Sequence, residues 1–274
     1  MSHRPLFLLS NDDGYRARGI RALAQALGAL GDVVVCAPES EQSTTSHSLT
    51  LTRPLRLRKV EEGQFAVDGT PADCVYVALN SGTRVLPRTP DVVVSGLNHG
   101  LNLGTDVFYS GTVAAAREGA LRGIPAMAAS ADMLCDLHEA AGACARLAKA
   151  LVELAPVSPE RMNQGSASSF QLRVPAPLIN VNVPPGRAWQ VLATRLGLRL
   201  YEDLVEFRHD PRGREYLWIG GGGVRHENLA GSDTDAHDGG AISVTPLLLD
   251  LTAADGAILA QRLAAAAGSG ASGA

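Results

Sequence analysis

The stretch Leu6-Phe7-Leu8-Leu9-Ser10-Asn11-Asp12-Asp13-Gly14 decides how the rest of this chain is interpreted. Its first four residues are all apolar and are followed at once by polar residues. That pattern is typical of a strand buried on both faces of a parallel sheet. The carboxyl ends of strands in open α/β sheets are where ligands bind. The sequence therefore predicts a central strand followed by a ligand site at Asp12 and Asp13.

Two adjacent carboxylates at a strand end indicate a cation site. Adjacent side chains point to opposite sides of an extended chain, so both aspartates serve one site only if the backbone turns there. Gly14 permits such a turn because glycine has access to positive φ. Two like charges repel each other, and a hard divalent cation with oxygen ligands would neutralise them. Asn-Asp-Asp-Gly is also a good turn and helix-cap sequence, so the stretch alone leaves a purely structural turn open.

Length and composition favour one large α/β domain with an appendage. The chain has 274 residues, of which 46% are hydrophobic, enough for a sizeable core. A net charge of −4 and the lack of a basic run argue against binding of a nucleic-acid duplex. We find no signal peptide and no apolar run of membrane-spanning length, and the four cysteines form no CxxC pair. We therefore expect free thiols, no membrane partner and a cytoplasmic location.

Strand and helix patterns alternate after the first strand. Apolar residues at helical spacing predict a helix over residues 20–30, and the run 32–36 reads as a second buried strand, which completes a βαβ unit. Residues 51–60 and 64–67 resemble a hairpin at the edge of the sheet. Further strands are predicted at 91–95 and 125–130, and further helices at 71–81, 113–121 and 135–154. The predicted fold class is an α/β, Rossmann-like three-layer core with a mostly parallel sheet.

Polar side chains follow the other strands at the same edge of this sheet. Ser43 lies in the hydroxyl-rich loop after the second strand; it could reach a metal or phosphate, although such loops more often make local turns. Asn98 follows the strand at 91–95, where its amide oxygen would complete an oxygen-rich shell with the two aspartates. Ser110, Gly111 and Thr112 open the next helix, so they either bind a phosphate or cap the helix, or do both.

The last third of the chain reads differently from the core. We expect a core over 1–184, an oligomerisation extension over 185–260 that returns one strand to the core, and a low-complexity tail over 261–274. Within the extension, residues 189–200 and 215–220 read as paired strands of a long hairpin. Because such a hairpin is marginal on its own, we expect it to pack on another subunit of a homodimer or homotetramer. The acidic segment 232–240 reads as a turn, with His237 as a solvated residue.

Several separated motifs resemble the SurE (survival protein E) family of nucleoside monophosphate phosphatases. The resemblance extends from Ser10 to Thr252 and rests on SNDDG (10–14), APESEQS (37–43), VDGTPADCV (67–75), VSGLNHGLNLGTDVFYSGTVAAAREG (94–119), NVNVP (180–184) and SVTPLLLDLT (243–252). The fourth motif is long enough to carry the assignment by itself. The resemblance implies a Rossmann-like core, a C-terminal part that exchanges between subunits, and hydrolysis of nucleoside 5′- and often 3′-monophosphates.

The resemblance also implies a ligand set for the metal. Carried over to this sequence, the metal ligands would be Asp12, Asp13, Ser43 and Asn98, with one divalent cation, Mg²⁺ or Mn²⁺, per subunit. Three positions depart from the family pattern. Thr44 stands where relatives usually have a glycine, Arg16-Ala17-Arg18 follow Tyr15 where relatives carry a shorter aliphatic residue and a proline, and Ser232 and Asp235 alter a Thr-Asp segment.

The resulting hypothesis is a metal-dependent 5′-nucleotidase. Asp12 and Asp13 would be catalytic as ligands, as a general base or as a nucleophile, and the sequence leaves these roles open. The phosphate would bind to Asn11, Ser110, Gly111 and Thr112. The alternative is a binding module that senses a nucleotide or metal without turnover, because an acidic pair and a phosphate-binding helix start suit either function.

Overall fold

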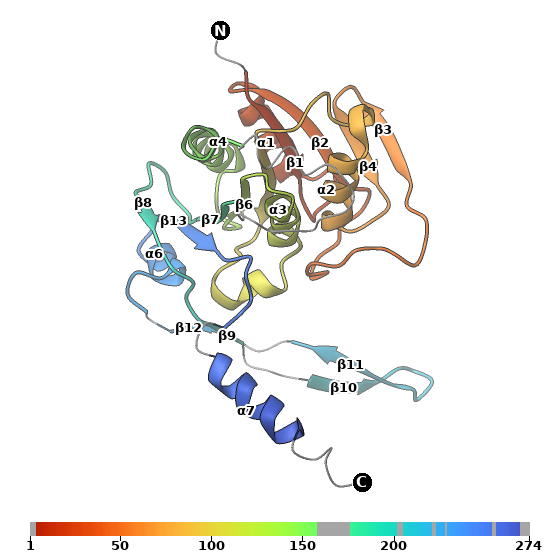
Figure 1. Ribbon diagram of the computed structural model, residues 1–274, viewed down its shortest axis with the longest axis vertical. Coiled ribbons are helices and arrows are strands. Elements are labelled where there is room, and N and C mark those ends of the chain that lie inside the picture. Colours follow the sequence, from red (N-terminus) through yellow and green to blue (C-terminus); the bar gives the residue numbers. More distant parts are fainter. Residues whose placement is uncertain are drawn as a thin grey trace.

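A nine-stranded, mostly parallel sheet forms the centre of the molecule. The computed structural model describes residues 4–157, 176–201, 205–220, 223–227, 229–253 and 256–268, and within them the sheet has the order β3-β4-β2-β1-β5-β6-β7-β13-β8 (Figure 1). Its strands are β1 (Leu6–Ser10), β2 (Asp32–Pro38), β3 (Leu57–Glu61), β4 (Gln64–Val67), β5 (Val92–His99), β6 (Ala126–Ala131), β7 (Leu178–Val183), β8 (Val191–Ala193) and β13 (Ile242–Leu247). The predicted central strand is β1, which pairs in parallel with both β2 and β5.

Two helices cover each face of the sheet. Helices α1 (Arg18–Gly28) and α4 (Leu137–Leu154) pack on one face, and α2 (Pro71–Asn80) and α3 (Gly111–Leu121) pack on the other. Alternate residues of β1 supply the two cores: Phe7 and Leu9 face α1, whereas Leu6 and Leu8 belong to the cluster under α2 and α3. This arrangement confirms the three-layer α/β prediction.

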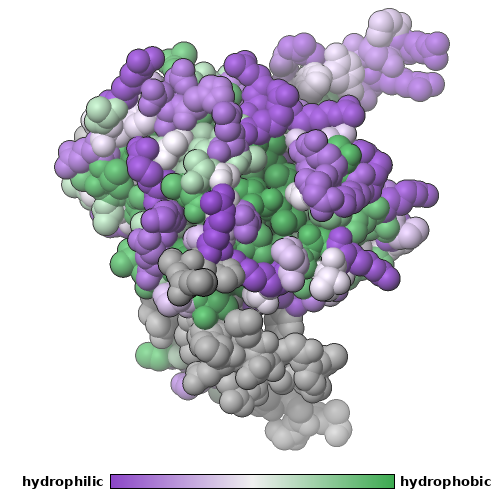
Figure 2. Space-filling view, turned by 90° about the horizontal axis from the view of Figure 1, so that it is seen from above, coloured by the Kyte–Doolittle hydropathy of each residue, from purple (hydrophilic) through white to green (hydrophobic). Residues whose placement is uncertain are grey.

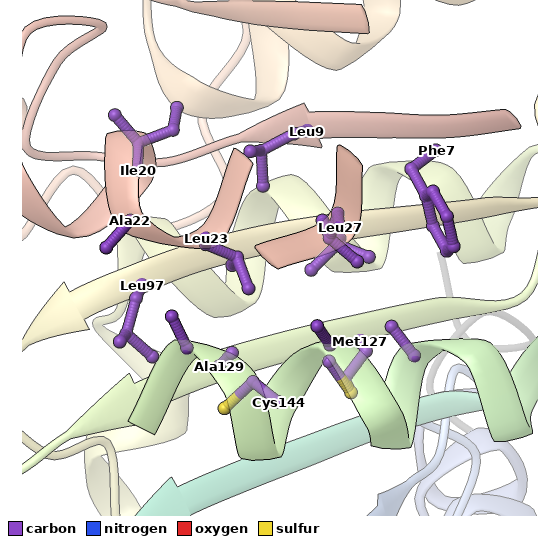
Figure 3. Packing of buried hydrophobic residues seen from close by; sticks show 14 of the residues in the cluster. Phe7, Leu9, Ile20, Ala22, Leu23, Leu27, Leu97, Met127, Ala129 and Cys144 are labelled. Carbon is purple, nitrogen blue, oxygen red and sulfur yellow. The ribbon is translucent and has the colours of Figure 1, made fainter. Parts of the chain in front are cut away.

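Helix α1 lies unusually close to the sheet. Its inner side is the apolar stripe of Ile20, Leu23 and Leu27, which packs toward Leu97 of β5 (Figure 3). Gly19 starts this stripe, and a Cβ atom at that position would stand 1.9 Å from the carbonyl oxygen of Leu97. The helix can therefore approach β5 only because position 19 carries no side chain.

The predicted edge hairpin and the start of α2 are confirmed. Strands β3 and β4 pair antiparallel at the edge of the sheet, although β3 is shorter than the predicted strand. At α2, the Thr70 side chain accepts from the backbone N–H of Asp73, whose carboxylate accepts from the N–H of Thr70. This reciprocal capping box, with Pro71 at the first turn, gives Asp73 a structural role.

The pairing predicted for the C-terminal hairpin is wrong. Residues 191–193 form β8, which pairs in parallel with β13, and β11 (Glu215–Ile219) pairs antiparallel with β10 (Val205–His209). The turn between the latter two closes locally, because the Asp210 N–H donates to the Arg214 carbonyl at 2.9 Å. The remaining elements are β9 (Arg199–Tyr201), β12 (Val224–His226), α6 (Asp233–Asp238), α7 (Ala257–Gly268), η1 (Gly82–Arg84) and η2 (Gly104–Phe108). Figure 1 shows β10, β11 and α7 below the core.

The acidic segment predicted as a turn is instead a short helix whose first half is buried. It forms the short helix α6, in which Asp233 is fully buried and accepts from the N–H groups of Gly104 (2.9 Å) and Gly197 (2.7 Å). His237 is mostly covered, and its Nε2 lies 3.4 Å from Asp132 Oδ2. The segment therefore joins the C-terminal part to the glycine-rich loop before α3.

The face of the molecule seen from above is mixed in hydropathy (Figure 2). Seen from above, hydrophilic side chains cover much of the surface, and apolar residues show between them (Figure 2). Within the described ranges, none of the helices combines the length and the apolar character that crossing a bilayer requires.

Candidate functional site

The predicted site residues gather at the carboxyl edge of the sheet. In the parallel pairing of β1 with β5, Ser10 lies opposite Ser95, so the Asp12-Asp13 turn and the end of β5 leave the sheet side by side. The register between β5 and β6 shifts between Ser95 and Asn98, which places Asn98 at the irregular end of its strand. The strand order alone thus brings three of the four predicted metal ligands to one edge.

The loop after β2 carries Ser43 to this edge. The Gln42 N–H donates to the backbone carbonyl of Asp12 at 2.7 Å, and the Ser46 N–H donates to the Tyr109 carbonyl at 3.2 Å. The loop therefore lies between the aspartate turn and the segment before α3. Ser43 itself is exposed, and its hydroxyl donates to Glu41 Oε1 at 2.7 Å.

Asp12 is the most deeply held of these side chains. It is 7% exposed, its Oδ1 accepts from Thr112 Oγ1 at 2.5 Å, and its Oδ2 accepts from the Thr112 N–H at 3.1 Å. The carboxylate thus sits at the N-terminus of α3, where the helix dipole favours negative charge. A Cβ atom on Gly111 would stand 2.8 Å from Asp12 Cβ, so the approach requires glycine there. Burial nevertheless raises the pKa of Asp12 to about 6, with Asp13 adding to the rise.

The donors present suit a hard divalent cation. Burial also raises the pKa of Asp13, so two desolvated carboxylates stand next to each other. Asn98 Nδ2 donates to the Gly100 carbonyl at 2.9 Å, which leaves its Oδ1 as the amide atom for a ligand. Within the described residues, there is no group of three or more His, Cys, Asp or Glu side chains that could hold a metal ion, so a site here would also need the amide and hydroxyl oxygens. A site of carboxylate, amide and hydroxyl oxygens matches Mg²⁺ or Mn²⁺.

The residues predicted to bind phosphate differ in how many of their hydrogen-bonding groups are already engaged. Ser110 caps α3, because its Oγ accepts from the Val113 N–H at 3.0 Å, and its hydroxyl proton remains for another acceptor. Both donors of Thr112 are directed at Asp12. Asn11 is fully buried; its Nδ2 donates to the Gly14 carbonyl at 3.0 Å, whereas its Oδ1 has no hydrogen-bond partner among the described residues. The phosphate-binding roles of these residues stay predictions.

Thr44, which stands beside Ser43 where the family pattern has a glycine, adopts a backbone conformation typical of glycine. Thr44 adopts a φ of +57°, a conformation that favours glycine and is least suited to a β-branched residue. The Thr44 hydroxyl donates to the Ser43 carbonyl at 2.7 Å. The loop thus keeps the glycine-type conformation with threonine in it.

We expect Thr44→Gly to stabilise the protein relative to Thr45→Gly. A side chain in the left-handed region costs about 1–2 kcal/mol, which glycine avoids, and this outweighs the extra freedom of about 0.5–1 kcal/mol that glycine gives the unfolded chain. Thr45 has no positive φ, so its replacement brings only the second effect. Each replacement also loses one hydroxyl hydrogen bond, to the Ser43 carbonyl for Thr44 and to the Gln42 carbonyl for Thr45, so this loss is matched in the two variants. Chemical denaturation measures both variants. If the two variants had the same free energy of unfolding, backbone strain at Thr44 would be contradicted.

Sequence reasoning missed a clamp of asparagines beneath the glycine-rich loop. Asn102 is buried; its carbonyl accepts from the side-chain amides of Asn180 (2.8 Å) and Asn182 (3.0 Å), and its N–H donates to Asn182 Oδ1 at 2.8 Å. Its own amide donates to Ser130 Oγ at 2.7 Å. Asn180 and Asn182 stand at alternate positions of the otherwise apolar strand β7, so they share one face. That spacing in the sequence could have indicated a buried polar contact. The clamp fixes the loop between Asn98 and α3.

His47 holds the Ser43 loop to α3. Its Nε2 lies 2.9 Å from Glu118 Oε2, and Glu118 is almost fully buried in the middle of the helix. Arg122 also binds this carboxylate, at 2.8 Å. A lone histidine in a polar loop gives no indication of such a partner, because Glu118 lies 71 residues away in the chain.

Comparisons with known proteins agree with this geometry. The family model described as survival protein SurE matches residues 7–203. The 5′-nucleotidase SurE of Sorangium cellulosum is 60% identical over 262 residues, 96% of each chain, and that of Myxococcus xanthus is 46% identical over 92% of this chain and 91% of the relative. A crystal structure of SurE protein from Aquifex aeolicus superposes with a TM-score of 0.73 at 39% identity, covering 94% of this chain and 99% of that one. The resemblance read from the motifs is confirmed: this chain belongs to the SurE family.

Proposed function

We propose that this protein is a metal-dependent phosphomonoesterase that hydrolyses nucleoside 5′-monophosphates, and 3′-monophosphates as well, to nucleoside and phosphate. The observation that carries the proposal is the Asp12 carboxylate, buried at the start of α3 with Asp13 beside it. A buried acidic pair next to a helix N-terminus brings a cation site and an anion site together. Membership of the SurE family, whose relatives bear the name 5′-nucleotidase, supports the same reaction.

In this proposal Asp12, Asp13, Ser43 and Asn98 hold one Mg²⁺ or Mn²⁺ per chain. When bound, the cation supplies Lewis acidity toward a phosphoryl oxygen and lowers the pKa of a coordinated water. Thr112 orients Asp12 through two hydrogen bonds. The clamp on Asn102 fixes the loop after β5, and the bond from Asn98 Nδ2 to the Gly100 carbonyl leaves the amide oxygen of Asn98 for the cation.

The helix start binds and orients the phosphate. The Ser110 hydroxyl and the Gly111 N–H lie at the positive end of α3, and both donate to phosphoryl oxygens in the proposal. Thr112 would hold Asp12 in place for the cation, because both of its donors are directed at that carboxylate. Asn11 supports the site by closing the turn through the Gly14 carbonyl.

Asp13 is the better placed of the two aspartates to accept a proton. Both oxygens of Asp12 already accept hydrogen bonds from Thr112, whereas Asp13 is only partly buried. A general base needs a free lone pair within reach of the water it activates. We therefore assign Asp12 as a ligand alone, and Asp13 as a ligand that also serves as the general base through its second oxygen. Trapping of a phosphorylated Asp12 with labelled substrate would overturn this assignment.

Phosphate release from a panel of 5′- and 3′-nucleotides tests the function. We expect release with Mg²⁺ or Mn²⁺, no release after treatment with a chelator, and recovery when the metal is added back. Calorimetric titration of the chelated protein should give one cation per chain. Release that persists in excess chelator would contradict the metal-dependent reaction, and tight nucleotide binding without release under any metal would contradict an enzyme.

The same proposal includes a homodimer or homotetramer assembled through residues 185–260. Strands β10 and β11 expose Phe207 (61%) and Trp218 (60%), which favours a contact with another subunit. Light scattering that gives a monomer at micromolar concentration would refute it. A cytoplasmic location is also part of the proposal, supported by four cysteines that are all free, three of them buried.

A further inference from the structure

Two large aromatic side chains stand exposed immediately before the helix start. Phe108, the last residue of η2, is 59% exposed, and Tyr109 is 65% exposed. Ser110, the N-cap of α3, follows them directly. Aromatic side chains carry the largest apolar areas in a protein, and they are enriched where a protein contacts a ligand. This pair thus lies beside the donors that the proposed function assigns to the phosphate.

The backbone that presents these rings is held on both sides. The N–H groups of Tyr109 and Ser110 both donate to the Asp106 carbonyl, at 3.0 and 3.1 Å. Ser46 donates its hydroxyl to the Phe108 carbonyl at 2.7 Å and its N–H to the Tyr109 carbonyl at 3.2 Å. The rings therefore project from a fixed segment that is also bonded to the loop of Ser43, so little backbone ordering is needed when a ligand binds.

Chain geometry limits how far the rings lie from the phosphate site. Tyr109 is two residues from Gly111, so their Cα atoms are at most about 7 Å apart. In a nucleoside monophosphate, only the sugar separates the phosphate from the base. A phosphate at the Gly111 N–H therefore brings the base of the same molecule within reach of an aromatic ring at 108 or 109.

We propose that Phe108 and Tyr109 form a stacking platform for the base of the nucleotide substrate. This inference rests on the proposed function and assigns the part of the site that distinguishes a nucleotide from a phosphate ester without a base. Stacking on an aromatic face tolerates every base because each base has a π-face. The platform thus gives a preference for nucleotides over sugar phosphates, with little discrimination between purines and pyrimidines.

The test compares adenosine 5′-monophosphate and uridine 5′-monophosphate with ribose 5-phosphate, which carries the same sugar and phosphate but no base. In Tyr109→Ala and in Phe108→Ala, we expect KM for the nucleotides to rise about 5- to 150-fold, the range for loss of one base–aromatic stack, with kcat little changed. KM for ribose 5-phosphate should stay within about twofold of wild type. Tyr109→Phe keeps the ring and should keep the nucleotide KM.

Leu154→Ala is the matched control for loss of an exposed apolar side chain. Leu154 is 85% exposed at the end of α4, and this helix begins after the carboxyl end of β6 and so ends near the opposite edge of the sheet. It should leave all three substrates unchanged. The platform is overturned if both alanine variants change KM for nucleotides and ribose 5-phosphate by the same factor, or change neither.

Binding without turnover separates this inference from the proposed function. Calorimetry in chelator should show that the wild type binds adenosine 5′-monophosphate more tightly than ribose 5-phosphate, and that Tyr109→Ala loses the difference. If that difference is present but no phosphate is released with any metal, the platform stands and the reaction fails. If phosphate is released from both substrates with no difference in binding or KM, the reaction stands and the platform fails.

Discussion

Replacement of Asp12 by asparagine should remove nearly all metal-dependent phosphate release while leaving the fold intact. Loss of a group that only supports a metal ligand lowers affinity or activity by about 10–100-fold, and we expect loss of a ligand itself to exceed the upper figure. Asparagine has the same shape and keeps one oxygen to accept a hydrogen bond from Thr112. Single-turnover phosphate release and metal titration by calorimetry measure the two effects.

The same variant should be no less stable than the wild type when both are free of metal. Asp12 is 7% exposed, and the charged group that acts on it most strongly among the described residues, Asp13, has the same sign. A buried carboxylate without a cation opposes folding, and a neutral amide removes that cost. Thermal unfolding in chelator tests this expectation. A large drop in melting temperature would mean that the activity loss reflects unfolding.

Asp136→Asn is the matched control for Asp12→Asn. Asp136 is also an aspartate that receives backbone N–H groups at a helix start, those of His138 (2.9 Å) and Glu139 (3.1 Å) of α4. Asparagine is an equally good N-cap, so stability should change little. Activity within about twofold of wild type would assign the effect at Asp12 to its position at the site. An equal loss in both variants would contradict the metal-ligand role.

Gly19→Ala should give the largest loss of stability among conservative changes in the core. The added Cβ would stand 1.9 Å from the Leu97 carbonyl oxygen and 3.5 Å from Leu97 Cβ, so α1 would have to move away from β5. Overpacking of this kind costs about 3 kcal/mol or more, because it opens the contacts of Ile20 and Leu23 as well. Urea denaturation measures the loss. Activity should also fall, since Asn98 directly follows Leu97.

Gly28→Ala is the control within the same helix. A Cβ atom at Gly28 would meet nothing within 4 Å, and the position lies at the other end of α1. Alanine restricts the unfolded chain and favours helix, so we expect a gain of about 0.5–1 kcal/mol. Equal stabilities for the two variants would contradict the close approach of α1 to β5.

The sequence alone was sufficient for the core of the fold, and it proposed where a site would lie. The apolar run 6–9 is typical of a strand buried on both faces. Together with the helical spacing over 20–30 and the strand at 32–36, it predicts the first βαβ unit. Because parallel strands end at one edge, Asp12, Asp13 and Asn98 were expected together before any contact was known. The local pattern suffices here because the backbone geometry of a strand or helix fixes which residues share a face, and burial of that face requires them to be apolar.

The tertiary structure decided which partner each polar group has. Thr112 donates hydrogen bonds to Asp12, 100 residues away, and the Asn102 carbonyl accepts one from the side chain of Asn180, 78 residues away. Asp233, expected in a turn, is instead buried against Gly104. Periodicity indicates which face of a segment is buried, but a hydrogen bond between distant residues depends on how the packed layers meet. The sequence therefore indicated which strand ends carry the candidate site residues, and packing determined the hydrogen bonds that hold their side chains.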